Sequence, residues 1–149
     1  MRGRRGFTLV EVLIVVCILG ILAGIAVPRV KRARARALGA SAGGSMRAIR
    51  IGVTIYFDST TTWPPTGSVG APPAGLAGYI PATSPFAGTG WRLQWRQFTV
   101  GARTVGAIAM TADDPAVCPT VANLLGGPSD EVSVLCGPAS GTVTQIIER

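Results

Sequence analysis

The chain has 149 residues with 14 basic and seven acidic side chains, a net charge of +7 and no histidine. The absence of histidine excludes histidine-based catalytic triads and the common histidine zinc sites. Charged residues make up 14 % of the chain, against about 25 % in a typical soluble domain. Together with a mean hydropathy of +0.42, this composition favours a chain with a membrane segment over a soluble enzyme.

The first apolar run, residues 7–27, contains one charge, Glu11. A helix of that length spans about 31 Å, roughly one bilayer core. A secretory signal peptide would explain the basic start and the small-x-small sequence Gly24-Ile25-Ala26, but the run is long for such a signal. A plain membrane anchor leaves Glu11 unexplained, because a carboxylate inside an apolar run costs a few kcal/mol unless it is paired or lies at the interface.

A third interpretation explains the whole start of the chain. A short basic leader ends in Gly6, Phe7 follows, and Glu11 is the fifth residue counted from Phe7. With these residues, the start of the chain resembles the prepilin signature of type IV pilins and of type II secretion pseudopilins. Gly20 and Pro28 also stand where the helices of that family usually carry a glycine and a proline. The resemblance covers roughly the first third of the chain.

The resemblance implies processing of the N-terminus. A prepilin peptidase would cut after Gly6 on the cytoplasmic side, and the new amine of Phe7 would be methylated. Because Gly6 has no side chain, a protease can approach the backbone closely there. The implied partners are the prepilin peptidase and methyltransferase, other subunits in a homo-oligomeric filament, an inner-membrane assembly platform and membrane lipid.

Glu11 is the candidate assembly residue. It lies one helical turn from Phe7 and therefore close to the new amine. Inside a bundle of such helices, its carboxylate could pair with the amine of a neighbouring subunit. This pairing would relieve the cost of an unpaired charge and favour one axial stagger. The alternative is a carboxylate that snorkels to the membrane interface.

Three helix-weakening residues, Gly20, Gly24 and Pro28, lie in this otherwise strong helix. Pro28 has no N–H and its ring clashes with the carbonyl of Gly24, so a kink is expected near these two residues. An ordinary, tolerated membrane-helix proline is the alternative. The helix is expected to continue as an amphipathic segment over residues 29–57 and to pack on a sheet. Apolar residues recur there at three- and four-residue spacing: Leu38, Ala42, Met46, Ile49, Val53 and Phe57.

Five basic residues follow Pro28 closely: Arg29, Lys31, Arg32, Arg34 and Arg36. They fit a cluster that touches lipid phosphates and a solvated helix face equally well. Nucleic acid is not expected as a partner, because no aromatic residue interleaves to stack bases. By the positive-inside rule, this cluster would place the C-terminal domain in the cytoplasm. The prepilin signature and a cysteine pair suited to an oxidising compartment favour a cytoplasmic leader and a periplasmic domain.

The rest of the chain predicts a small sheet. Residues 58–90 contain six glycines, six prolines and one charge, which predicts a loop region. The run Trp91-Arg92-Leu93-Gln94-Trp95 alternates like a strand, and Phe98 and Val100 resume out of phase, which allows a bulge. Further strands are predicted at residues 105–110, after a turn at Gly101-Ala102, and more weakly at 132–135 and 142–147. The expected fold is α+β, a pilin-like roll with a long helix packed on a small antiparallel sheet.

The cysteines add one candidate cross-link. Pilins often carry a C-terminal disulfide that bounds a variable surface loop, so the resemblance implies a bond between Cys118 and Cys136, which enclose 17 residues. Closing such a loop stabilises a fold by about 3 kcal/mol in the chain-entropy model. Two free buried thiols are the alternative. Cys17 lies in the apolar run and is expected to be a small apolar filler.

No cofactor or metal is expected. Asp58, Asp113 and Asp114 are similar in kind to the calcium ligands of the major pseudopilins, but they form no recognisable calcium-loop pattern. Two adjacent aspartates before a proline are more typical of a turn. The sequence also shows no nucleophile and base at recognisable spacing, so no catalytic residue is assigned and an enzyme is not expected.

The predicted organisation has four parts: a cleaved leader at residues 1–6, a membrane or filament-core helix at 7–28, its amphipathic continuation at 29–57 and a globular head at 58–149. The resemblance implies a structural subunit of a type IV pilus-like filament used in adhesion, motility or DNA uptake. The alternatives are a pseudopilin of a type II secretion system and a DNA-binding minor pilin. The expected location is the bacterial inner membrane, crossed once, and then a surface pilus or a periplasmic pseudopilus.

Overall fold

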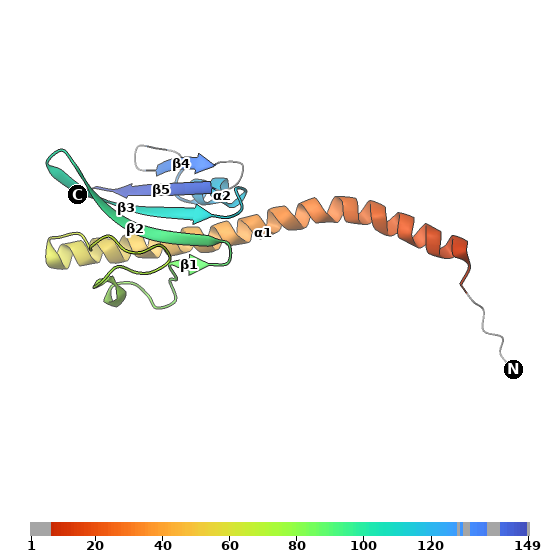
Figure 1. Ribbon diagram of the computed structural model, residues 1–149, viewed down its shortest axis with the longest axis horizontal. Coiled ribbons are helices and arrows are strands. Elements are labelled where there is room, and N and C mark those ends of the chain that lie inside the picture. The colour runs from red at the N-terminus through yellow and green to blue at the C-terminus, as the bar shows by residue number, and fades with distance from the viewer. Residues whose placement is uncertain (1–6, 128, 130–131, 137–140, 149) are drawn as a thin grey trace. The chain divides into compact units, whose positions relative to one another are not determined.

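The chain divides into two compact units that share one long helix. The structure, a computed structural model, describes residues 7–127, 129, 132–136 and 141–148. The units are Met1–Arg34 and Ala35–Arg149, and helix α1 (Leu9–Thr60) runs through both (Figure 1). The prediction that the helix continues beyond Pro28 is confirmed, and the helix ends at Thr60 rather than at Phe57.

The described part of the first unit is an exposed stretch of α1 and the two residues before it. Every side chain from Phe7 to Arg34 is exposed. A window of 18 residues in this helix has a mean hydropathy of 2.9, and none of that window is buried. Within the described residues, α1 is the one helix long and apolar enough to cross a membrane. Such a surface needs a cover of lipid or of other apolar helices.

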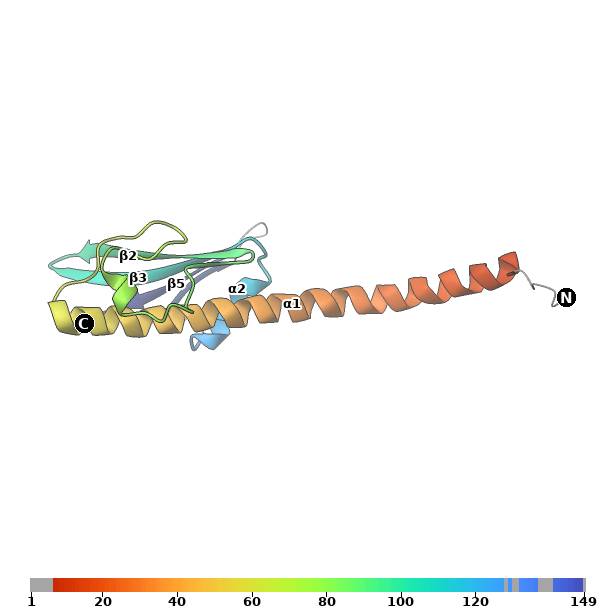
Figure 2. The same cartoon turned by 90° about the horizontal axis from the view of Figure 1, so that it is seen from below.

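The second unit is an antiparallel sheet with the C-terminal half of α1 packed on one face (Figure 2). The described strands lie in the order β1-β2-β3-β5-β4, and every neighbouring pair is antiparallel. The predicted α+β class, a long helix on a small antiparallel sheet, is therefore confirmed. The strands are β1 (Ala87–Gly88), β2 (Trp91–Val100), β3 (Arg103–Ala112), β4 (Val132–Cys136) and β5 (Gly141–Ile147).

The apolar stripe predicted on α1 forms the helix side of the core. Its four central residues, Ala42, Met46, Ile49 and Val53, are fully buried. They share one core with inward-facing residues of the sheet, among them Trp91, Leu93, Trp95, Ile108, Met110 and Val143. Each large apolar side chain buried in this way contributes about 1.5–3 kcal/mol, so packing rather than helix propensity holds this half of α1 in place.

Strands β2 and β3 form a hairpin without a bulge. Their residues pair one to one from Trp91 opposite Ala112 to Val100 opposite Arg103, and Gly101 supplies the positive φ of 62° at the turn. The suggestion of a bulge in this strand was therefore wrong. Phe98 lies on the sheet face opposite the inward-facing tryptophans and is exposed, as is Val100. The apolar residues of β2 change from one face to the other after Trp95 because the core ends there. No extra residue is inserted into the strand.

The predicted loop region, residues 58–90, contains three short pieces of regular structure. They are the last turn of α1, the 3-10 helix η1 (Leu76–Gly78) and the two-residue strand β1. The prediction of a continuous loop was wrong at these positions, although residues 61–75 and 79–86 have no helix or strand. Buried Leu76 and the edge-on contact between Tyr56 and Tyr79, with ring centroids 5.3 Å apart, fix the segment to the core.

The same segment follows the side of β2 that faces away from β3. The N–H of Gly67 donates to the carbonyl of Trp95 over 3.0 Å, and the N–H of Gly70 donates to the carbonyl of Leu93 over 2.8 Å. The side chain of Gln94 also reaches the carbonyl of Gly67 over 3.1 Å. Backbone groups of β2 on this side are therefore bonded to the loop rather than left open.

Sequence analysis missed a second helix, α2 (Val117–Leu124). Its buried residues Val117 and Val121 are four positions apart. This helical spacing is visible in the sequence but covers only one turn. Pro119 falls in the first turn, where a missing N–H does no harm. At the other end of the helix, the guanidinium of Arg47 on α1 donates to the carbonyl of Leu124, one of the carbonyls that a helix end leaves unpaired.

Two glycines of α1 form the contact surface for α2. A Cβ atom on Gly39 would lie 2.7 Å from the side chain of Thr120, and one on Gly43 would lie 3.1 Å from the side chain of Leu124. A Cβ atom on Gly44, by contrast, would meet nothing within 4 Å. Gly39 and Gly43 are therefore positions where a second helix approaches α1 closely.

This arrangement predicts opposite effects of two glycine-to-alanine changes. Gly39→Ala is expected to destabilise the head by about 1 kcal/mol net, because overpacking by 1–3 kcal/mol exceeds the gain in helix propensity. Gly44→Ala should stabilise it by roughly 0.5–1 kcal/mol, since only the propensity gain remains. Thermal unfolding of the detergent-solubilised chain, followed by near-ultraviolet circular dichroism, measures both. Stabilisation by both variants would contradict the close contact of α2 with Gly39.

Candidate processing and assembly site

The first turn of α1 is closed by a reciprocal pair of hydrogen bonds between Thr8 and Glu11. The backbone N–H and the hydroxyl of Thr8 each donate to Oε2 of Glu11 over 2.9 Å. The N–H of Glu11 donates in turn to the hydroxyl oxygen of Thr8 over 3.2 Å. This is the capping-box arrangement, in which a threonine and a glutamate three residues later satisfy donors that a helix start leaves unpaired.

The capping box fixes where the carboxylate of Glu11 lies. Glu11 is exposed in the single chain, and its carboxylate is held beside the N–H of Thr8, the residue that follows Phe7. The negative charge therefore stands at the positive end of the helix dipole and within one turn of Phe7. Gly6, the residue before the expected cleavage point, lies outside the described residues.

Thr8 is the residue that sequence analysis missed in this site. The spacing Thr-x-x-Glu just before an apolar run is a recognised helix start, so the signal was available. It matters for the interpretation of Glu11, because a capping carboxylate has a role within its own chain. That role is compatible with pairing to a neighbour, since a carboxylate has two oxygens with about four acceptor positions, and only Oε2 is used in the capping box.

The three helix-weakening residues lie inside α1 without interrupting it. Cβ atoms built on Gly20 and Gly24 would meet nothing within 4 Å. The carbonyl of Pro28 accepts a hydrogen bond of 3.3 Å from Nε of Arg32. A kink at Gly24–Pro28 stays a prediction. These glycines leave a shallow, small-residue surface on the apolar helix, which suits close approach of another helix.

The basic cluster after Pro28 is exposed along its whole length. None of its five residues forms an ion pair with a residue that the structure describes. Such a run of exposed cations is suited to the phosphates of a lipid surface. Both interpretations drawn from the sequence, a lipid contact and a solvated face, remain predictions.

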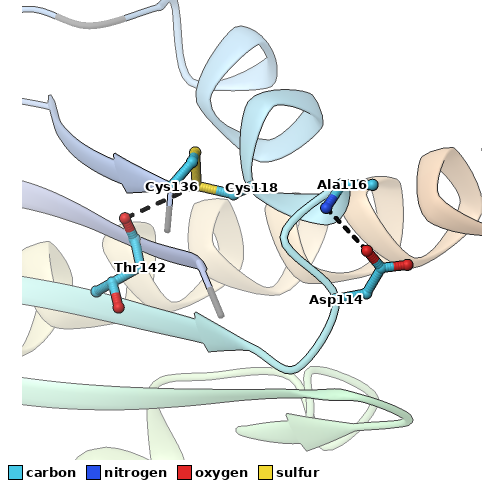
Figure 3. Close-up of a disulfide and its surroundings, with 5 residues drawn as sticks. All are labelled: Asp114, Ala116, Cys118, Cys136 and Thr142. Carbon is cyan, nitrogen blue, oxygen red and sulfur yellow. Dashed lines mark hydrogen bonds between the residues drawn. A yellow bond between two sulfur atoms is a disulfide. The ribbon is translucent and has the colours of Figure 1, made fainter. Parts of the chain in front are cut away.

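The C-terminal cross-link joins the second helix to the sheet (Figure 3). Cys118 on α2 and Cys136 at the end of β4 form a disulfide with a Cα–Cα distance of 5.9 Å and a sequence separation of 18. Cys118 is fully buried, and a Cβ atom on Gly141 of β5 would lie 2.5 Å from its Cβ atom. Pro128, Asp130 and Glu131 of the bounded segment lie outside the described residues. Cys17 is a free, exposed thiol.

The adjacent aspartates form a turn that leads into α2. Oδ1 of Asp114 accepts a hydrogen bond of 2.9 Å from the N–H of Ala116 (Figure 3), which is the local pairing expected of an aspartate in a turn. Asp113 beside it is exposed. Within the described ranges, no three or more cysteine and carboxylate side chains come together as a candidate metal site.

Comparison with known proteins identifies the start of the chain. Residues 1–27 match the family model described as the prokaryotic N-terminal methylation motif, which is the signature of type IV pilins and pseudopilins. No solved structure matches the chain. The motif indicates a pilin-like or pseudopilin protein and a structural subunit rather than an enzyme. It implies processing by a prepilin peptidase and assembly with other pilin subunits, and with the apolar helix it fits a membrane-anchored precursor.

Proposed function

We propose that this chain is a structural subunit of a type IV pilus-like filament that is cleaved after Gly6, methylated on Phe7 and assembled through α1. The observation that carries the proposal is the methylation motif at residues 1–27. The motif extends into a helix whose first turn holds the carboxylate of Glu11 at the N–H of Thr8, the residue after Phe7. Phe7 is itself exposed and helix α1 begins only at Leu9, so the expected cleavage point precedes the helix.

The exposed surface of α1 supports assembly through helices. In the first unit its apolar side chains are uncovered, and lipid can cover them only while the chain is in a membrane. In the second unit, the face of α1 turned away from the sheet still exposes Ile51 at 61 % and Ile55 at 48 %. Helices of other subunits would cover both sets of side chains once the chain leaves the bilayer.

The proposed pathway begins in the bacterial inner membrane, with the leader in the cytoplasm and the head in the periplasm. An assembly platform in that membrane would transfer the processed subunit into the filament. The disulfide that ties α2 to β4 suits an oxidising compartment and favours a pilin, used in adhesion, motility or DNA uptake, over a pseudopilin. In this proposal the head has a structural role and no catalytic residue.

Intact mass measurement tests the processing step. Protein extracted from the membrane is expected to lack residues 1–6 and to carry one added methyl group on Phe7. Replacing Gly6 with valine should leave the leader attached, because the added side chain obstructs the approach of the peptidase to the backbone. Thr66→Val, far from the leader in sequence, serves as the control and should be processed normally. A mature chain that begins at Val27 would identify an ordinary secretory signal and reject the proposal.

A further inference from the structure

A cleft of about 500 Å³ lies where α1 ends and the β2–β3 hairpin extends beyond the core. Its volume falls within the usual range for small-molecule sites, roughly 300–1,000 Å³. All of its lining residues belong to the second unit, and none of them carries an ionisable group. They are Phe57, Thr61, Thr62, Trp63, Gln97 and Thr104.

One wall of the cleft is aromatic and held in place. The rings of Phe57 and Trp63 are tilted by 41° with centroids 4.5 Å apart. The indole N–H of Trp63 donates to the carbonyl of Thr104 over 2.8 Å, and the indole also packs on the ring of Trp95 at 5.8 Å. Trp63 is only 8 % exposed, and Phe57 is half-buried. These contacts fix the position of the aromatic wall, which lowers the entropic cost of binding.

The other wall carries polar groups that are available for bonding. Gln97 and Thr104 lie on neighbouring strands, on the face of the sheet that the core occupies further along the hairpin. Both side chains are exposed. The carboxamide of Gln97 makes no hydrogen bond to any residue that the structure describes, so it can offer two N–H donors and one carbonyl acceptor to a ligand.

Thr61 at the rim has an unfavourable backbone. It is the one described non-glycine residue with a positive φ, 57°, and its N–H donates to the carbonyl of Phe57 over 2.7 Å to end α1. Glycine usually occupies this position at a helix end, because a β-branched side chain is strained in the left-handed region. The hydroxyl of Thr61 donates to the carbonyl of Thr60 over 2.7 Å, so towards a ligand its oxygen can only accept a hydrogen bond.

We infer that this cleft binds one residue of a neutral carbohydrate. A pyranose ring has an apolar face of C–H groups, which can pack on the half-buried ring of Phe57 and on the small exposed part of the Trp63 indole. Its hydroxyls both donate and accept hydrogen bonds, as Gln97 and Thr104 can, and the hydroxyl oxygen of Thr61 can accept one. The uncharged lining offers nothing to neutralise a phosphate, sulfate or carboxylate. The inference does not depend on the assembly of the chain into a filament.

Saturation-transfer NMR on the full chain tests the site. The chain is held in dodecylphosphocholine micelles, whose headgroup contains no sugar, and the probes are galactose, N-acetylglucosamine and lactose at millimolar concentration. Saturation is expected to pass to the ring C–H groups of at least one probe, with a shift of the indole N–H signal of Trp63. Gln97→Leu and Thr104→Val, which keep shape and remove bonding groups, should each raise the Kd about fivefold.

Two further variants separate binding from folding. Thr111→Val removes an exposed hydroxyl from β3 outside the cleft and should leave the Kd unchanged. Thr61→Gly should raise the Tm, because strain is relieved, and yet weaken sugar binding, because the hydroxyl is lost. The inference is rejected if no neutral sugar binds or if only dextran sulfate or oligothymidylate binds. It is also rejected if Gln97→Leu and Thr104→Val bind sugar as tightly as the natural chain. A higher Tm with unchanged binding in Thr61→Gly would contradict the role of Thr61.

Discussion

Replacing Glu11 with alanine is expected to abolish incorporation of the subunit into filaments. The variant should still accumulate in the membrane, because losing a charge from the apolar run makes insertion easier by a few kcal/mol. It should also still lose residues 1–6. Assembly fails in the proposed mechanism because the amine of a neighbouring Phe7 then has no carboxylate to pair with, and an unpaired charge in a helix bundle is costly. Sheared-filament yield and intact mass measure the two outcomes.

The capping box makes a sharper control possible. Glu11→Gln keeps an oxygen that can accept from the N–H of Thr8 but removes the charge, since glutamine also serves in this motif. Thr8→Val removes the hydroxyl that bonds Glu11 and keeps the charge. Charge pairing predicts that Glu11→Gln fails to assemble and Thr8→Val assembles. The reverse pattern would show that Glu11 acts within its own chain as a cap, and the pairing mechanism would then be wrong.

Removing the disulfide is expected to have the largest effect on the stability of the head. The double variant Cys118→Ala, Cys136→Ala should lose about 3 kcal/mol of unfolding free energy, because the unfolded chain is no longer constrained by a closed loop. The loss should fall first on α2, which the cross-link ties to β4. Denaturant titration, followed by the fluorescence of the three tryptophans, gives the free energy for both forms.

Cys17 supplies the matched comparison for that experiment. It is a free thiol in the first unit, so Cys17→Ser should leave the unfolding of the head unchanged. Treatment with dithiothreitol should lower the midpoint of the natural chain to that of the double variant and should not affect the double variant itself. Equal midpoints for the natural chain before and after reduction would mean that the cross-link contributes nothing to stability.

The sequence predicted the parts of the fold that depend on local periodicity. The stripe from Ala42 to Val53 was predicted because its spacing repeats over several turns, and the strands because their residues alternate. The strand order could not be predicted, since it depends on contacts between distant segments. Helix α2 was not predicted because its eight residues are too short to repeat the helical apolar spacing. A bulge was suggested in β2 because the apolar pattern changes where the core ends, although the backbone pairing continues.

The candidate sites also differ in whether their residues are close together in the sequence. Gly6, Phe7 and Glu11 could be predicted from the sequence because the prepilin pattern is contiguous, and their roles stay predictions. Thr8 lies inside that pattern, but its role depends on helix capping, which the prepilin pattern of charge and small residues does not express. The cleft brings Gln97 beside Trp63, residues from two segments that only the folded chain places together, and no local pattern could have predicted it.

The loop of residues 61–75, which runs alongside β2, has a consequence for how copies of this chain would meet in the proposed membrane pathway. An open strand edge is a template for pairing with the same strand of another molecule, the first step towards a cross-β aggregate. Because Gly67 and Gly70 already occupy carbonyls of β2, that edge of a waiting subunit is closed to its neighbours. In the proposed pathway, precursors crowded in a membrane would then not adhere to one another through this strand.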